Sequence, residues 1–131
     1  MERIFLKKII RKKLINKRKK HYLEITSKHC LDIYKLIKKK YKNVNVIGGY
    51  ASVNYEFDCL KLLKFLNLKK FTTCLPKIKK NYQMDFYKYS FNEPLMVNNL
   101  GITDPLKITK KKIPDLIFVP LVGFDNKLNR L

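Results

Sequence analysis

Cysteine is scarce in this chain, and its three cysteines, Cys30, Cys59 and Cys74, lie far apart in the sequence. An odd number of widely spaced cysteines argues against a disulfide framework and against a zinc knuckle. Such usage is typical of proteins in a reducing compartment, so the sequence predicts a cytoplasmic protein. We expect each cysteine to be a small residue of the hydrophobic core.

Long hydrophobic runs are absent too. No apolar run approaches the roughly 20 residues that span a bilayer, so we expect no membrane partner. The N-terminal stretch MERIFLKKIIRKKL lacks the long apolar segment and the small-residue cleavage site of a secretory signal. Its basic pattern continues well into the chain, which argues against an organelle transit peptide.

Acidic residues are few: ten Asp and Glu stand against 30 Lys and Arg, and the net charge is +20. Residues 1–42 hold 16 basic and 3 acidic residues, so this segment contributes +13. Such a bias attracts polyanions such as nucleic acid, nucleotide phosphates, anionic lipid or a polyglutamate tail. Abundant Lys, Ile, Asn and Tyr without Trp are also typical of an A/T-rich coding sequence, in which Lys is enriched regardless of function.

The common catalytic patterns are missing as well. No Ser-His-Asp set, Walker motif or CxxC pair occurs in the sequence. His21 and His29 lie on or near a predicted helix, without a Cys or Asp partner at the spacing of a nucleophile. We interpret both as surface or boundary residues, and we assign no catalytic residue and no metal ligand.

The chain does contain three segments with helical periodicity. Apolar residues about one turn apart predict helices over residues 3–20, 22–40 and 59–67. In the first helix, Ile4, Phe5, Ile9 and Ile10 widen the stripe that we expect to be buried. Asp58 is a suitable N-cap for the third helix.

Other segments have the composition of strands. We expect short strands at residues 44–47, at 71–76 where Pro76 ends the run, and at 83–89 with one wet face. A turn-rich loop over 98–105 precedes a last strand at 115–120. That strand is apolar throughout, which is typical of burial on both faces.

This order of elements is typical of an α/β fold. We expect an open, mostly parallel twisted sheet with helices on both faces, Rossmann-like and three-layered. The 131 residues are one domain in size, and a hydrophobic fraction of 46% is enough to fill a core. Ligands of such sheets bind beyond the carboxyl ends of the strands. The loops at 48–58, 76–82 and 120–131 are therefore the expected site.

Four stretches, in order along the chain, carry a family resemblance. The first is KKIIRKKLINKRK, with Lys7, Ile10, Arg11 and Arg18, and the second is YASVNYEFD, with the triplet Glu56-Phe57-Asp58. The third is NNLGITDP, with Asn98 or Asn99, Gly101, Ile102, Asp104 and Pro105. The fourth is DLIFVPLVGFDNKLNRL, with Asp115-Leu116-Ile117, Pro120, Gly123-Phe124-Asp125 and Arg130-Leu131. Together they resemble the 5-formyltetrahydrofolate cyclo-ligase family, also called 5,10-methenyltetrahydrofolate synthetases.

The resemblance implies a ligase of one-carbon folate metabolism that uses ATP and Mg²⁺. It would close 5-formyltetrahydrofolate, with or without a polyglutamate tail, into 5,10-methenyltetrahydrofolate. The formyl oxygen attacks the γ-phosphate, N10 then attacks the phosphorylated carbon, and phosphate leaves as the ring closes. Such phosphoryl transfer needs cations around the triphosphate. We expect the protein to act as a monomer.

The resemblance also implies roles for individual residues. Lys7, Lys8 and Arg11 would reach the ATP phosphates from the first helix, where positions four apart share a face. Arg130 would meet the phosphates from the other side with its forked guanidinium. Glu56 would hold the pterin, and Ala51 would add a backbone contact to the same pocket. We interpret Asp58 as a helix cap and Asp104 and Asp125 as turn residues.

Other interpretations of these residues stay open. The basic residues of the first helix also fit a solvated face, Arg130 fits a disordered terminus, and Glu56 fits an acid ahead of a helix. The chain as a whole could instead be a basic nucleic-acid-binding module. Against that, its aromatic residues are not interleaved with the basic ones as base stacking would require.

The family pattern continues beyond the point where this sequence stops. In the family, Arg-Leu is followed by a stretch Gly-x-Gly-x-Gly-x-Tyr-Asp that wraps the nucleotide phosphates, whereas this sequence stops at Leu131. Leu128 also replaces a turn glycine of the family. We therefore expect one domain over residues 1–131 without the glycine-rich loop, the last elements and the acid that faces magnesium. Such a chain could be an incomplete gene prediction, a fragment from a short contig, or an inactive product of a decayed gene.

Overall fold

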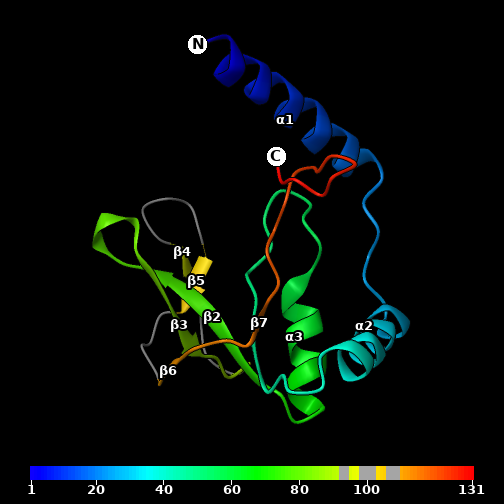
Figure 1. Ribbon diagram of the computed structural model, residues 1–131, viewed down its shortest axis with the longest axis vertical. Coiled ribbons are helices and arrows are strands. Elements are labelled where there is room, and N and C mark those ends of the chain that lie inside the picture. The colour runs from blue at the N-terminus through cyan, green and yellow to red at the C-terminus, as the bar shows by residue number, and fades with distance from the viewer. Residues whose placement is uncertain (92–94, 98–102, 106–109) are drawn as a thin grey trace. The chain divides into compact units, whose positions relative to one another are not determined.

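The computed structural model of the protein describes residues 1–91, 95–97, 103–105 and 110–131 (Figure 1). The chain divides into two compact units. The helix-loop unit consists of Met1–Glu24, Ser52–Phe57 and Pro120–Leu131. The sheet unit consists of Ile25–Ala51 and Asp58–Val119.

The sheet unit contains a five-stranded mixed sheet with the order β6-β3-β2-β1-β7. Its strands are β1 (Val46–Gly48), β2 (Thr72–Ile78), β3 (Met84–Lys88), β6 (Lys111–Lys112) and β7 (Leu116–Ile117). β1 is parallel to both β2 and β7, whereas β3 is antiparallel to β2 and β6. The predicted α/β class is confirmed, with the parallel strands in the core of the sheet.

Two helices of the sheet unit, α2 (Ser27–Lys40) and α3 (Cys59–Leu68), pack against each other, and α3 packs against β2. Leu62, Leu63 and Leu66 project from α3 at helical spacing and are fully buried. Asp58 caps this helix as predicted, since its carboxylate accepts the Lys61 N–H at 3.2 Å.

The three cysteines belong to this core, which confirms their predicted place. Cys30, Cys59 and Cys74 are at most 1% exposed and carry free thiols. Burial raises the thiol pKa to about 12 for Cys59 and about 11 for Cys74. Thiols with such pKa values stay protonated at neutral pH, so these residues act as small apolar side chains.

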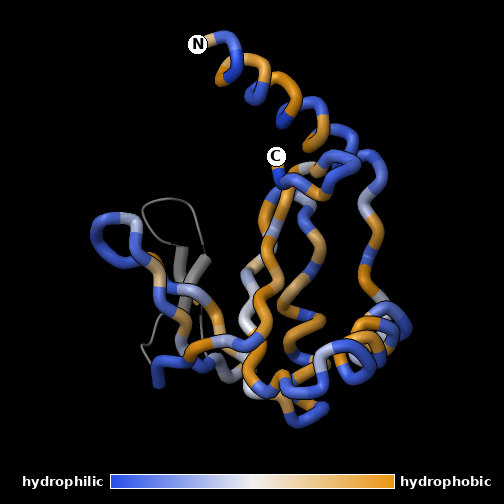
Figure 2. Tube along the Cα trace, viewed as in Figure 1, coloured by the Kyte–Doolittle hydropathy of each residue, from blue (hydrophilic) through white to orange (hydrophobic). Residues whose placement is uncertain are grey.

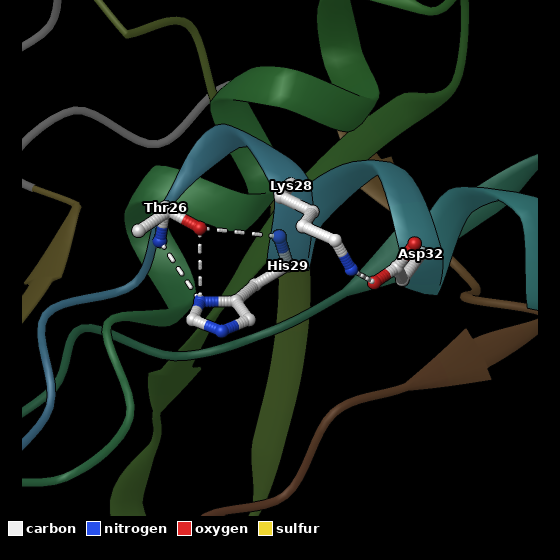
Figure 3. A network of polar contacts seen from close by, with 4 residues as sticks. All are labelled: Thr26, Lys28, His29 and Asp32. Atoms are coloured by element: carbon white, nitrogen blue, oxygen red, sulfur yellow. Dashed lines mark hydrogen bonds and ion pairs between the residues drawn. The ribbon is translucent and has the colours of Figure 1, made fainter.

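Helix α2 begins at Ser27, five residues after the predicted start, because Thr26 caps it (Figure 3). The Thr26 hydroxyl accepts the His29 N–H at 3.4 Å, and His29 Nδ1 accepts the Thr26 N–H at 3.0 Å. This is the reciprocal geometry of a capping box, with His in the place where Glu or Gln is usual. Lys28 and Asp32 add an exposed ion pair of 2.9 Å one turn apart.

Strand β2 continues through Pro76, so the prediction that this proline ends the strand is wrong. Tyr89 N donates to Thr73 O and Lys79 N donates to Gln83 O, so the odd-numbered residues of β2 make the ladder bonds to the β3 side. Pro76 lies between two such pairs, and its nitrogen points toward β1, whose pairing ends at Gly48. A missing N–H costs nothing there.

Strand β3 has no wet face at its centre, contrary to the prediction. Phe86 and Tyr87 are neighbours in the sequence and are 9% and 8% exposed, so both faces of the sheet are covered at this point. The Phe86 ring lies against Gly48, where an added Cβ would come within 2.8 Å of Cε1. A strand between two others can be packed on both faces.

The segment 115–120 also differs from its prediction. Residues alternate between exposed and half-buried, with Ile117 45% and Val119 50% exposed, while Leu116 and Phe118 pack on the core. β7 lies at the end of the strand order, and its apolar run is buried on one face rather than two.

The predicted loop over 98–105 contains a strand at its end. β4 (Leu95–Val97) and β5 (Thr103–Pro105) form an antiparallel pair in which Met96 lies opposite Asp104. Asp104 is therefore a strand residue and not the turn residue that we predicted. Asn98, Asn99, Gly101 and Ile102 of the third motif lie outside the described residues.

Candidate functional site

Three segments that are distant in the sequence form the helix-loop unit, and each carries one of the motif stretches. They are helix α1 (Glu2–Lys20), the loop Ser52–Phe57 and the segment Pro120–Leu131. We refer to the last two as the 52–57 loop and the terminal loop. The predicted site residues Lys7, Lys8, Arg11, Glu56 and Arg130 all belong to this unit.

Helix α1 has the predicted extent but contains no buried residue. The expected stripe of Ile4, Phe5, Ile9 and Ile10 is 37–67% exposed, so the prediction of its burial is wrong. Hydrophobic and hydrophilic residues alternate along the tube of α1 (Figure 2). The two loops contact the C-terminal half of α1, at Leu14, Arg18 and Lys19, and the first turns stay exposed.

The 52–57 loop is a tight turn closed by its own acid. Asn54 and Tyr55 both have left-handed backbone conformations, with φ of 50° and 61°. The turn lets Glu56 N donate to Val53 O, while Glu56 Oε2 accepts the Val53 N–H, each at 3.0 Å. Consecutive left-handed residues other than glycine are costly, and they cluster at functional sites.

Contacts from α1 hold this loop. The Arg18 guanidinium donates to Asn54 O at 2.6 Å and to Leu121 O of the terminal loop at 3.2 Å. Lys19 Nζ lies 5.6 Å from the centre of the Tyr55 ring, and Tyr22 meets the same ring edge-on at 6.0 Å. These contacts connect α1 to both loops.

Asp125 organises the terminal loop, as predicted for a turn residue. Its carboxylate accepts the backbone N–H groups of Lys127 and Asn129 and the side-chain amide of Asn129, all at 2.9 Å. These donors, Asn129 first, hold the pKa of this carboxyl below its usual value. Leu131 N also donates to Gly123 O at 2.9 Å, so Arg130 lies on a loop that is bonded back on itself.

Two hollows of about 290 Å³ and a third of about 250 Å³ open in this unit. The third is lined by Ile10, Leu14, Phe124, Asp125, Asn129, Arg130 and Leu131. The arginine hollow is lined by Arg11, Glu56, Pro120, Leu121, Val122, Arg130 and Leu131. The tyrosine hollow is lined by Tyr22 and the run from Ser52 to Glu56. Glu56 lines the last two of these, so one acidic residue borders a hollow with two arginines and another with two tyrosines.

The predicted site residues thus fall into three groups. Arg11, Glu56 and Arg130 meet at the arginine hollow. Lys7 and Lys8 are exposed on α1 and line none of the three hollows. Ala51 is half-buried in the sheet unit, just after β1.

Sequence reasoning missed several residues of this site. It gave no role to Arg18, although the residue stands in the first motif, and it overlooked Tyr22 and Tyr55. The one sequence feature that could have indicated the tyrosine hollow is an aromatic residue, Tyr55, directly before the triplet that starts at Glu56.

No metal site and no membrane helix emerge from the described part of the chain. Within it, no three His, Cys, Asp or Glu side chains gather closely enough to hold a metal ion. Within the same residues, no helix combines the length and the apolar character that crossing a bilayer requires.

Comparison of the sequence with known proteins identifies a family. A model of the 5-formyltetrahydrofolate cyclo-ligase family matches residues 4–131. A 5-formyltetrahydrofolate cyclo-ligase of Haemophilus influenzae is 29% identical over 112 residues, which cover 80% of this chain and 57% of that protein. The chain thus spans little more than half the length of this curated relative.

Two solved structures share the fold. The 5,10-methenyltetrahydrofolate synthetase of Aquifex aeolicus superposes with a TM-score of 0.65 at 24% identity, over 92% of this chain and 63% of its own. The corresponding enzyme of Mycoplasma pneumoniae gives a TM-score of 0.56 at 18% identity, over 95% of this chain and 70% of its own.

Proposed function

Because the chain belongs to the 5-formyltetrahydrofolate cyclo-ligase family, we propose that it takes part in the closure of 5-formyltetrahydrofolate to 5,10-methenyltetrahydrofolate with ATP. The observation that carries the proposal is the arginine hollow. It brings Arg11 of the first motif, Glu56 of the second and Arg130 of the fourth to one place. Three motif residues from distant parts of the sequence are expected to meet where substrates bind.

The two arginines fit the phosphates of ATP. Each guanidinium offers a planar set of N–H donors that matches phosphate oxygens. Both side chains border one hollow from different segments, so they can contact a chain of phosphates from two sides. When bound, ATP would activate the formyl oxygen as a leaving group. Lys7 and Lys8 lie on the same helix and would add positive potential.

Glu56 fits the donor-rich ring of a pterin. Its Oε2 already accepts the Val53 N–H, which fixes the direction of the carboxylate. A carboxylate can accept further hydrogen bonds from ring N–H and amino groups. Since Glu56 also lines the tyrosine hollow, we propose that the folate lies on that side and the phosphates on the side of the arginines. Ala51 would contribute through its backbone.

Magnesium enters the proposal only with the nucleotide. Mg²⁺ in such enzymes is often held by substrate phosphates and water with few protein ligands. The described residues contain no cluster of His, Cys, Asp or Glu suited to a metal, so we assign it no ligand here. We further propose that the protein acts as a monomer in the cytoplasm, and that residues 1–131 belong to one cyclo-ligase domain.

Direct binding tests this proposal. Calorimetric titration of the 131-residue chain with ATP and with 5-formyltetrahydrofolate should give saturable binding of both. Arg11→Ala should weaken ATP binding, while Arg3→Ala, at an exposed arginine of the same helix that lines none of the three hollows, should not. Absence of binding of either ligand by the unaltered chain would reject the proposed function.

The basic charge calls for one further control. A chain that binds through charge alone would be retained on duplex DNA, with an affinity that falls steeply as salt rises. We expect the calorimetric ATP signal to depend on Arg11 and not on Arg3. Equal losses for both variants, together with retention on DNA, would favour the nucleic-acid-binding alternative.

A further inference from the structure

Arg18 differs from the other basic residues of α1. All residues of this helix are among those that the structure describes. Ten of them are Lys or Arg, and of these ten Arg18 alone is not exposed. Its Nη2 donates to Asn54 O at 2.6 Å and its Nη1 to Leu121 O at 3.2 Å. The acceptors lie 36 residues and 103 residues away in the sequence. The half-buried side chain therefore binds protein backbone at two places.

The two acceptors belong to the walls of two of the hollows. Asn54 lines the tyrosine hollow and Leu121 lines the arginine hollow. Asn54 is also one of the two consecutive left-handed residues that turn the 52–57 loop toward Glu56. A turn of this kind persists only where its surroundings fix it, and the short bond from Arg18 to Asn54 O does so.

Arg18 is not satisfied fully by these contacts. Its Nε is buried and has no hydrogen-bond partner among the described residues. A buried donor without a partner costs free energy. Arg18 thus keeps its two carbonyl contacts while its Nε stays without a partner among the described residues.

We propose that Arg18 is a positioning residue that holds the 52–57 loop and the terminal loop at a fixed separation on α1. Through Asn54 it would set the place of Glu56, and through Leu121 it would set the wall of the hollow that Arg11 and Arg130 share. This inference rests on the proposed function. It adds that binding of the folate and of the nucleotide depends on one guanidinium that touches neither.

A forked cation is required for this role. A guanidinium can donate to two carbonyls in fixed directions from separate nitrogens, whereas the ammonium group of lysine is a single point charge. Arg18→Lys should therefore keep the charge and lose the geometry. We expect affinity for ATP and for 5-formyltetrahydrofolate each to fall by about 10-fold, the size of one charge-assisted hydrogen bond.

The pattern across variants separates positioning from direct contact. Arg18→Lys and Arg18→Ala should weaken both ligands, Arg11→Ala only ATP, and Arg3→Ala neither. Ethylguanidine at millimolar concentration should restore part of the binding to Arg18→Ala, and ethylamine should not. Ligand affinities of Arg18→Lys equal to those of the unaltered chain would overturn the inference.

Amide hydrogen exchange provides a readout that does not depend on ligands. In Arg18→Ala, exchange should accelerate at Glu56, whose N–H donates to Val53 O, and at Leu131, whose N–H donates to Gly123 O. Amides of α3 should be unaffected. If the unaltered chain binds no ligand, the proposed function fails. The positioning role of Arg18 then fails too, even if faster exchange in Arg18→Ala shows that Arg18 holds the two loops. If it binds both ligands and exchange in the two loops is unchanged in Arg18→Ala, the inference alone fails.

Discussion

Glu56 accepts the backbone N–H of Val53, three residues before it, through Oε2 at 3.0 Å. The same residue lines the arginine hollow and the tyrosine hollow. The carboxylate therefore closes its own loop and faces the space in which we place the substrate.

Glu56→Gln separates these two tasks. Glutamine retains an oxygen that can accept the Val53 N–H, but it loses the charge that strengthens hydrogen bonds from a donor-rich ring. We expect affinity for 5-formyltetrahydrofolate to fall roughly 10-fold or more, with ATP affinity and the unfolding midpoint unchanged. Calorimetry with each ligand checks this, and Glu2→Gln on α1 is the control. Equal loss for both ligands would instead indicate a purely structural acid.

Arg130 should contribute to ATP binding and not to folding. It is exposed on the terminal loop, and its side chain borders the arginine hollow. Arg130→Ala is expected to weaken ATP binding about 10-fold, which is the size of one charge-assisted hydrogen bond. Lys127→Ala, an exposed cation of the same loop that lines none of the three hollows, is the matched control. Calorimetry should give a lower ATP affinity for Arg130→Ala than for Lys127→Ala. Equal ATP affinities would show that Arg130 acts only through its charge at long range.

Asp115 should make stability depend on acid pH. Its Oδ2 accepts the N–H groups of Asn45 and Val46, both at 2.9 Å, which joins the start of β7 to the start of β1. These donors hold the pKa of the carboxyl below its usual value of about 4. The stabilisation is therefore complete above about pH 4 and is lost as the pH falls through the depressed pKa.

Asp115→Asn removes this titration. The variant should be less stable at neutral pH, and its stability should decline less steeply than that of the unaltered chain below pH 4. Urea unfolding at several pH values measures both effects. Parallel stability curves for the two proteins would show that Asp115 does not titrate in this way.

Gly49 is required by close packing in the sheet unit. A Cβ at this position would come within 2.7 Å of Cys59 Sγ and of Leu63 Cδ1, two buried atoms of α3. Gly49→Ala should therefore lower the free energy of unfolding by about 1–3 kcal/mol, the usual cost of overpacking. Thermal unfolding monitored by circular dichroism checks this. An unchanged midpoint would mean that α3 shifts away without cost.

At Leu128, in contrast to Gly49, the chain has a side chain where the backbone conformation favours glycine. Its φ of 63° lies in the left-handed region, and the side chain is 79% exposed. Leu128→Gly should relieve the backbone strain at little cost in packing, for a gain of about 0.5–1 kcal/mol. Slower proteolysis of the terminal loop would show the gain. Faster proteolysis would mean that chain entropy outweighs the strain.

Sequence patterns predicted the secondary-structure elements better than they predicted how these elements pack. The α/β class, the extent of α1, the cap at Asp58 and the burial of the cysteines all follow from local periodicity and capping chemistry, and each is confirmed. The start of α2 was missed because His29 serves in a capping box where Glu or Gln is usual.

Tertiary context explains the other differences. Pro76 is tolerated within β2 because its nitrogen faces beyond the end of β1, which only the register reveals. The apolar run after Asp115 gives no sign that β7 lies at the end of the strand order with one exposed face. The site was predicted as motif residues, but the role that we propose for Arg18 depends on two carbonyls that carry no sequence signal.

The central claim is that the helix-loop unit binds ATP at the hollow shared by Arg11 and Arg130. The most direct measurement is calorimetric titration of ATP into the unaltered chain, Arg11→Ala and Arg3→Ala under identical salt. We predict saturable binding that weakens about 10-fold in Arg11→Ala and is unchanged in Arg3→Ala. No binding by the unaltered chain, or equal affinities for all three proteins, would contradict the claim.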